Sequence, residues 1–219
     1  ETPLQIYSRD KKLISEFGEK HSRPLRYNEV PPLLVYAFLA AEDDNFFNHQ
    51  GVSLKGLARA FVGLAESGSI QSGGSTITMQ VAKNYFLSSQ RTFSRKLTEI
   101  LLNIEDALSK EEILELYVNK IYLGQRAYGI GAAAEVYYSK NVNQLSLAEI
   151  AMIAGLPKAP SKYNPVVNPK RAIERRDWIL GRMLNLGYIK QATYEQAIAE
   201  GTGIQYRATV DEVKAPYLA

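Results

Sequence analysis

Apolar residues recur along most of the chain at the spacing of α-helices. In the uncharged run from residue 30 to 41, Leu34, Val35, Phe38 and Leu39 fall on one stripe, and Glu42 continues it. The same periodicity predicts further helices over 53–66, 75–87, 94–108, 110–122, 129–138, 146–155, 169–186 and 191–199. Two short segments at 4–7 and 12–17 flank a polar turn and predict a β-hairpin. The pattern therefore predicts a mainly α fold with a small N-terminal β-hairpin.

Length and composition indicate one globular unit. The chain has 219 residues, of which 46% are hydrophobic and 22% charged, so it can bury a substantial core. We divide it into a hairpin and lead-in at 1–29, a catalytic domain at 30–200, and a tail or start of a linker at 201–219. The glycine- and serine-rich stretch at 67–74 is expected to be a mobile loop. No alternation of strands and helices points to a nucleotide-binding sheet.

Charge and cysteine content exclude several functions. The net charge is +3, from 26 basic and 23 acidic residues, and no basic block or nucleic-acid motif accompanies it, so nucleic acid is not an expected partner. The absence of cysteine excludes disulfides, thiol catalysis and cysteine zinc sites. The longest uncharged run, 30–41, is shorter than the ~20 residues of a spanning helix. We therefore expect a soluble or membrane-peripheral chain.

An acidic cluster ends the first apolar stripe. Glu42, Asp43 and Asp44 stand at the C-terminal end of a predicted helix, where each acid opposes the helix dipole by about 0.3–1 kcal/mol. Burial by Phe38 and Phe46, with repulsion from the two neighbouring acids, is expected to raise the pKa of Glu42 into the range of a general base. The alternative is a helix that simply ends in a solvated acidic loop.

The helix that follows Gly73 and Gly74 has a polar face. A double glycine lets a ligand approach backbone N–H groups, and a helix N-terminus favours anions. The opposite face carries Val81, Ala82, Tyr85 and Phe86, which can pack. An ordinary amphipathic helix with a solvated face is the alternative. The polar face consists of Thr76, Gln80, Lys83 and Asn84.

Three cations gather near the start of the next predicted helix, which begins at Ser94. Arg91, Arg95 and Lys96 oppose the helix dipole there, and a bound phosphate would relieve the conflict. An ordinary surface ion pair with Glu99 is the alternative. Taken together, the carboxylates and cations suit a reaction with a negatively charged leaving group. These candidates are Glu42, Glu99, Lys83, Arg91, Arg95 and Lys96.

Five motifs follow one another along residues 30–185. They are EDDNFFNHQG at 42–51, GGSTITMQ at 73–80, RKLTE at 95–99, KEEILELYVN at 110–119 and RRDWIL at 175–180. In this order they resemble the motifs of peptidoglycan glycosyltransferases, which form the catalytic domain of class A penicillin-binding proteins and also occur as monofunctional enzymes. Met79 stands where the family usually has Gln, and no Ser-x-x-Lys, Ser-x-Asn and Lys-Thr-Gly set of a transpeptidase follows.

The resemblance implies a bilobal, lysozyme-like fold and polymerisation of lipid II at the outer face of the bacterial cytoplasmic membrane. The donor would be a glycan on polyprenyl pyrophosphate, the acceptor the 4-hydroxyl of the incoming sugar, with inversion at the donor carbon. Glu42 would be the base and Glu99 would position substrate or a divalent cation, Mg²⁺ or Mn²⁺. The pyrophosphates would be held by Lys83, Arg91, Arg95 and Lys96, and other substrate contacts would come from Asp43, Ser75, Thr76, Gln80, Asn84 and Ser161.

Residue chemistry favours this reaction over two alternatives, a lysozyme-like glycan hydrolase and an inactive cell-wall binding module. Pyrophosphate leaves as a stable anion, so one base and a basic cluster suffice. A glycosidase needs a second carboxyl across the bond.

The remaining candidates favour structural interpretations, although a membrane contact stays open. We expect motifs 110–119 and 175–180 to be mainly structural, with Arg175 and Arg176 bracing the lobes. His49 is expected to make a structural hydrogen bond, and Trp178 to lie in the core rather than form a sugar platform. One apolar set could either rest on a membrane surface or pack in the core. It consists of Leu54, Leu57, Phe61, Leu64 and Ile70.

Overall fold

The computed structural model describes residues 4–7, 13–17, 20–48, 77–86, 101, 103–104 and 106–206. Every helix predicted within these ranges is present, with ends within three residues of the prediction. The helices are α1 (Pro32–Glu42), α3 (Ile77–Phe86), α5 (Lys110–Lys120), α6 (Ile130–Tyr138), α7 (Leu147–Ala154), α8 (Pro169–Asn185) and α9 (Gln191–Ile198). The helix predicted over 53–66 and most of that over 94–108 lie outside the described residues.

The strands are few and short. β1 (Leu4–Tyr7) pairs antiparallel with β2 (Leu13–Phe17), which confirms the predicted hairpin. A second pair is parallel, between β3 (Lys20–His21) and β4 (Ala127–Tyr128). The described part of the chain is therefore mainly α, as the periodicity predicts.

Local capping explains where several helices begin and end. Ser109 starts α5 and Ser146 starts α7, and each side chain accepts a hydrogen bond from the N–H of a glutamate three residues later. Each glutamate reaches back to the N–H of its serine, which completes a capping box. At the other end, Gly187 follows α8 with a φ of +78°, a left-handed conformation that glycine adopts without strain.

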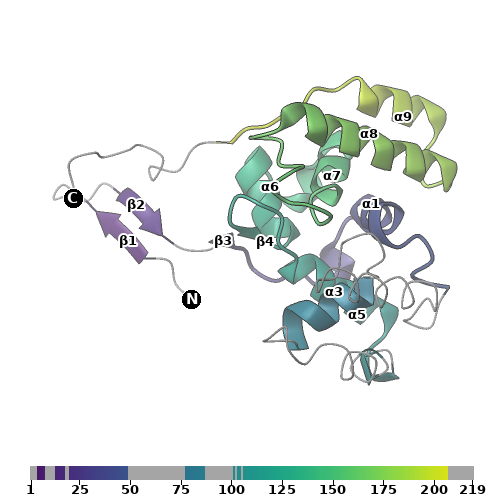
Figure 1. The fold of residues 1–219 in the computed structure, drawn as a ribbon, viewed down its shortest axis with the longest axis horizontal. Helices are drawn as coiled ribbons and strands as arrows, with labels where there is room; N and C mark the ends of the chain where they lie inside the picture. Colours follow the sequence, from purple (N-terminus) through teal and green to yellow (C-terminus); the bar gives the residue numbers. More distant parts are fainter. Residues whose placement is uncertain are drawn as a thin grey trace, which may run out of the picture.

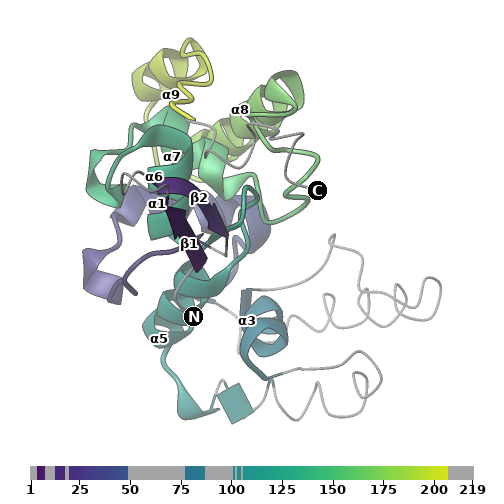
Figure 2. The same cartoon turned by 90° about the vertical axis from the view of Figure 1, so that its left-hand side faces the viewer.

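The helices lie on two sides of α1. Figure 1 shows α6 to α9 on one side and α3 and α5 on the other, and Figure 2 shows the same separation after a quarter turn. Helix α1 packs on α7 and α8, while α3 packs on α5. Phe38 and Tyr117 meet edge to face at 5.5 Å and so join α1 to α5. The C-terminal end of α1 therefore lies where both sides can reach it.

The fourth motif holds the segment that leads into α1. Asn119 of α5 accepts a hydrogen bond from the N–H of Leu25 at 2.8 Å and donates one to its carbonyl at 2.7 Å. Glu115 accepts from the N–H of Tyr27 at 2.8 Å. These contacts support the structural interpretation of 110–119.

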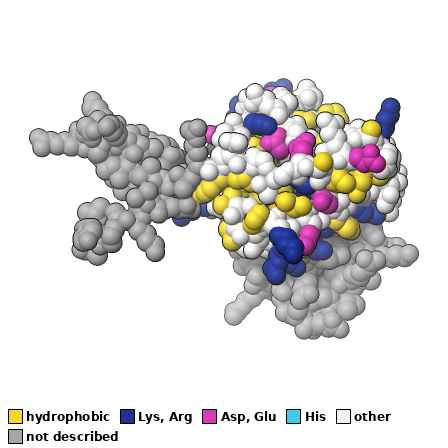
Figure 3. Space-filling view, turned by 90° about the horizontal axis from the view of Figure 1, so that it is seen from above, with side chains coloured by type: hydrophobic (Ala, Val, Ile, Leu, Met, Phe, Trp, Pro, Cys, Tyr) yellow, Lys and Arg dark blue, Asp and Glu magenta, His cyan; other side chains and the backbone are white. Residues whose placement is uncertain are grey.

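Charges of both signs are mixed on one face of the molecule. Figure 3, a view onto the side formed by α8 and α9, shows acidic and basic side chains interspersed with apolar ones. Separately, the helices in the described ranges include none that combines the length and apolar character needed to cross a membrane.

Candidate active site

Glu42 is the last residue of α1, and the helical stripe carries it toward the core. Leu34, Val35, Phe38 and Leu39 are all buried, as their spacing predicts. The side chain of Glu42 is only 8% exposed. Because burial penalises the charged carboxylate, it raises the pKa of Glu42 from 4.5 to about 7. A carboxyl with this pKa can accept a proton near neutral pH, as a general base must.

Two side chains reach the Glu42 carboxylate from the two sides of α1. Gln80 of α3 donates from Nε2 to Oε2 at 3.5 Å, and Nη2 of Arg175 in α8 lies 3.7 Å from Oε1. Arg175, Gln80 and the charge of Lys158 all lower the pKa, but burial has the largest effect. Among the described residues Oε1 has no hydrogen-bond partner. The carboxylate is thus located by long contacts, and one oxygen can accept a proton without losing a hydrogen bond.

The two acids after Glu42 hold different helices. Asp43 accepts a hydrogen bond from the backbone N–H of Ile77, the first residue of α3, at 3.4 Å, and its charge raises the pKa of Glu42 as predicted. Asp44 instead pairs with Arg182 of α8, whose Nη2 lies 2.6 Å from Oδ2. Of the two acids expected to raise the pKa by repulsion, Asp43 acts in this way and Asp44 is paired with a cation.

Two arginines of α8 also bind the end of α1. Arg175 donates from Nη2 to the carbonyl of Ala41, and Arg182 from Nε to the carbonyl of Ala40, each at 3.5 Å. Cations near the last carbonyls of a helix complement its dipole. The conflict between the acids and the C-terminal end of α1 is therefore partly relieved by α8.

Arg175 is a site residue that the sequence reasoning missed as such. Its side chain is 7% exposed, and burial lowers its pKa against the influence of the Glu42 charge. The available signal was its place on the buried stripe of α8, which also carries Ala172 and Ile179. A charged residue on such a stripe needs a partner. The neighbouring Arg176 donates at 2.8 Å to the carbonyls of Glu200 and Gly201, so it holds α8 to the segment that follows α9 on the same side of α1.

The prediction that Trp178 lies in the core is wrong. The indole is 49% exposed, because it projects from α8 beside the buried stripe rather than on it. The Arg175 guanidinium lies 4.5 Å from the centre of the ring. Trp178 therefore borders the Glu42 site.

Helix α3 presents the polar face that the sequence predicts. Gln80 and Asn84 are half-buried and Lys83 is exposed, whereas Val81 and Ala82 are buried on the other face. Met79, at the position where Gln is expected, is buried in the core. Gln80 alone among these residues makes a described contact with Glu42.

Tyr117 of α5 adds a hydroxyl to the surroundings of Glu42. The side chain is fully buried, and its hydroxyl has no hydrogen-bond partner in the described part of the chain. Burial raises the pKa of Tyr117 well above its ordinary value, and the charges of Glu42 and Asp43 act in the same direction. The hydroxyl thus stays protonated and remains a donor.

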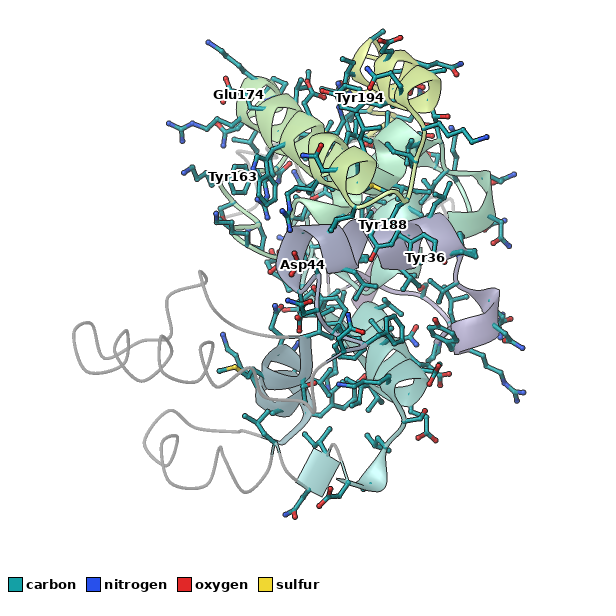
Figure 4. The ribbon with its side chains drawn as sticks, turned by 90° about the vertical axis from the view of Figure 1, so that its right-hand side faces the viewer. Tyr36, Asp44, Tyr163, Glu174, Tyr188 and Tyr194 are labelled. Carbon is teal, nitrogen blue, oxygen red and sulfur yellow. The ribbon has the colours of Figure 1, made fainter. Side chains whose placement is uncertain are left out.

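The connector between α7 and α8 brings a cation near Glu42, and the substrate contact predicted for Ser161 stays a prediction. Ser161 is exposed, and its carbonyl accepts a hydrogen bond from Asn168 at 3.2 Å. Lys158, which the sequence reasoning did not single out, is exposed and close enough for its charge to act on Glu42. Figure 4 shows Tyr163 of this connector on the same side of the ribbon as Asp44.

Several predicted site residues lie outside the described residues, and their roles stay predictions. The same holds for His49, the loop at 67–74 and the apolar set between 54 and 70. In the described ranges, no three His, Asp or Glu side chains form a group that could hold a metal ion. The site residues concerned are Ser75, Thr76, Arg91, Arg95, Lys96 and Glu99.

Comparison with known proteins points to one family. A family described as Transglycosylase matches residues 10–184. The chain is 62% identical to penicillin-binding protein 1A of Pseudomonas aeruginosa over 99% of its length, and 50% identical to penicillin-binding protein 1A of Escherichia coli over 99%. It spans only 27% and 26% of those two proteins. The crystal structure of penicillin-binding protein 1A from Haemophilus influenzae matches with a TM-score of 0.60 and 35% identity, over 95% of this chain and 22% of that one.

Proposed function

The chain belongs to the transglycosylase family, and from this premise we propose that it is a peptidoglycan glycosyltransferase that polymerises lipid II into glycan strands. The observation that carries the proposal is Glu42, which is 8% exposed, has a pKa of about 7 and lies between α3 and α8. A base of this kind is what activation of a sugar hydroxyl near neutral pH requires.

In the proposed reaction, Glu42 takes the proton of the acceptor 4-hydroxyl as its oxygen attacks the donor anomeric carbon. A bond forms between these two atoms, and the bond from the anomeric carbon to the pyrophosphate oxygen breaks with inversion. The electron pair leaves with the pyrophosphate, and the proton remains on Glu42.

Positive charge replaces a general acid in this scheme. Pyrophosphate is a stable anion, so its departure depends on nearby cations more than on protonation. Lys83 is exposed on the polar face of α3, one turn beyond Gln80, where it can meet a phosphate. We propose Arg91, Arg95 and Lys96 as further cations and Glu99 as a residue that positions substrate or a divalent cation.

The neighbouring acids favour transfer over hydrolysis. A lysozyme-like hydrolase needs a second carboxyl to act as acid or nucleophile. Asp43 accepts the N–H of Ile77 and Asp44 pairs with Arg182, so both carboxylates already hold other helices. This arrangement supports one base rather than a catalytic pair.

We propose that the chain works at the outer face of the cytoplasmic membrane, where lipid II and the polyprenyl-linked glycan would be presented. Because the chain spans about a quarter of its curated relatives, a transpeptidase domain of the same longer protein is a further proposed partner.

Purified lipid II tests the proposal directly. We expect the chain to convert lipid II into polymer and to leave finished glycan uncut, with Glu42→Gln as the inactive control. Cleavage of finished glycan without polymer formation would support the hydrolase instead. Binding to glycan without either reaction would support a wall-binding module.

A further inference from the structure

Trp178 combines exposure with a fixed orientation. A single exposed aromatic ring is ordinary on a protein surface. This indole is 49% exposed, yet the guanidinium of Arg175 lies 4.5 Å and that of Arg182 5.8 Å from its centre. Cations at these distances from a tryptophan ring attract it. The ring therefore meets solvent without being loose on the surface.

The two arginines are themselves tied to the end of α1. Arg182 pairs with Asp44 at 2.6 Å, and Arg175 lies 3.7 Å from Glu42 and donates to the carbonyl of Ala41 at 3.5 Å. The indole is thus connected to the candidate base through one intervening guanidinium. A ring already held in place loses little conformational entropy when a ligand covers it.

A second aromatic side chain approaches the same guanidinium. Tyr163, half-buried in the connector between α7 and α8, has its ring centre 5.7 Å from the Arg175 guanidinium carbon. Figure 4 shows Tyr163 and Asp44 on the same side of the ribbon. Two aromatic rings from different segments therefore meet at one arginine beside Glu42.

The charges around the ring argue against an anionic ligand. Arg175 faces the carboxylate of Glu42, and Arg182 faces that of Asp44, so both cations already have counter-charges. The exposed indole offers an apolar surface. A pyranose ring matches this combination, since its C–H face can cover an indole while its hydroxyl and acetamido groups meet polar side chains.

We propose that Trp178, with Tyr163 and Arg175, forms a saccharide-binding platform beside Glu42 that stacks an N-acetylated pyranose ring. The inference rests on the proposed function for the identity of the sugar, which belongs to the growing strand or to incoming lipid II. Its role is to hold a sugar unit in register with the base, separately from the cations that hold pyrophosphate.

Tryptophan emission tests binding without any turnover. Trp178 is the only tryptophan of the chain, so the intrinsic fluorescence reports on the platform alone. We expect a saturable blue shift on titration with the β-1,4-linked tetramer of N-acetylglucosamine, with a dissociation constant on the order of 1 mM. Inorganic pyrophosphate should cause no such shift. An emission spectrum that stays constant with the tetramer, or that responds to pyrophosphate instead, overturns the proposal.

Kinetic measurements show whether Trp178 binds a sugar or only supports Arg175 and Arg182. Trp178→Leu should raise KM for lipid II or shorten the product strands by roughly tenfold, the effect of losing one good contact, while kcat and Tm change little. Trp178→Phe should recover part of the loss. The matched control is Tyr122→Leu, because Tyr122 is 40% exposed and its ring packs against Tyr128 rather than against an arginine of the platform.

The two arms also distinguish the platform from the proposed function. If Trp178→Leu raises KM and shortens the product strands, the platform binds sugars of both incoming lipid II and the growing strand. If it shortens the strands at normal KM, the platform binds the growing strand. Both outcomes support the platform. If Trp178→Leu instead lowers Tm or shifts the acid limb of the pH profile with normal KM and strand length, the indole only supports the arginines and the proposal is wrong. A chain that binds the tetramer but forms no polymer would retain the platform and lose the proposed function.

Discussion

Two equally buried glutamates have different surroundings in this molecule. The side chains of Glu42 and Glu149 are each 8% exposed. Glu149 stands in the first turn of α7 and accepts from Lys140 at 2.7 Å and from the N–H of Ser146 at 2.8 Å. Glu42 stands at the end of α1, with partners at 3.5 and 3.7 Å. Burial by itself therefore does not make a carboxylate reactive.

The helix ends explain much of the difference. Glu149 lies at the positive end of the α7 dipole and accepts two short hydrogen bonds. The negative end of the α1 dipole disfavours the carboxylate of Glu42, and its compensating contacts are long. The comparison teaches that a buried acid without short partners keeps a raised pKa while longer contacts hold it in position, which is what the proposed role of Glu42 requires.

The largest expected effect is the difference in turnover between substitutions of the two glutamates. Glu42→Gln should lower polymerisation of lipid II by about 10² to 10⁴, because the amide cannot accept the acceptor proton. Glu149→Gln should leave turnover nearly unchanged and cost about 1–2 kcal/mol of unfolding free energy, because it weakens a capping box. Initial rates and circular dichroism measure both. Equal losses of turnover in the two variants would remove the distinction between them.

The second effect concerns stability and pH. The folded pKa of Glu42, about 7, lies above its ordinary value of 4.5, so the folded state binds this proton more tightly. The stabilisation that the protonated Glu42 gives the folded state is fully present below pH 4.5 and is lost as the pH rises to 7. The free energy of unfolding should fall by about 3 kcal/mol over this range. Urea denaturation from pH 4 to 8 should reveal this decline in the wild type and not in Glu42→Gln. Parallel curves for the two proteins would contradict the raised pKa.

A third effect sharpens the role of the long ion pair. Arg175→Met keeps a side chain of similar length but removes the charge that lowers the pKa of Glu42. The acid limb of kcat against pH should move upward by about one unit, with roughly fivefold lower turnover at pH 7 that recovers at higher pH. Arg175→Lys, which keeps the charge, should show a smaller shift. An unmoved acid limb would mean that Arg175 does not act on the base.

The smallest effect tests the neighbouring ion pair. Asp44 and Arg182 are 40% and 34% exposed, and partly exposed pairs contribute about 0.2–1 kcal/mol. Asp44→Asn should therefore lower the unfolding free energy by that amount and leave the acid limb of the pH profile in place. A loss above about 2 kcal/mol would show that this pair does far more than an ordinary surface contact.

Much of the fold could be predicted because helices carry their own signal. Apolar spacing locates α1 and α5 to α9 within a few residues, and serine followed by glutamate three residues later marks where α5 and α7 begin. Glu42 was found by the same logic, since it continues a stripe that the structure buries. Local periodicity tells which face of a helix is buried.

Periodicity does not tell what lies across that face. Arg175 and Glu42 meet only because α8 packs on α1, and no local pattern links positions so far apart in the chain. Lys158 acts on Glu42 from a connector without any repeat. Trp178 was assigned to the core because large aromatic side chains are usually buried, yet it is held in solvent by two arginines. Contacts between distant elements decided each of these outcomes.

The adjacent bonds of Asp43 and Asp44 attach two helices to one short stretch of the chain. Asp43 accepts the N–H of Ile77 in α3 at 3.4 Å, and Asp44 pairs with Arg182 of α8 at 2.6 Å. Because these two acids share one peptide bond and directly follow Glu42, the spacing of α3 and α8 is coupled to the carboxylate that Gln80 and Arg175 contact from the same two helices.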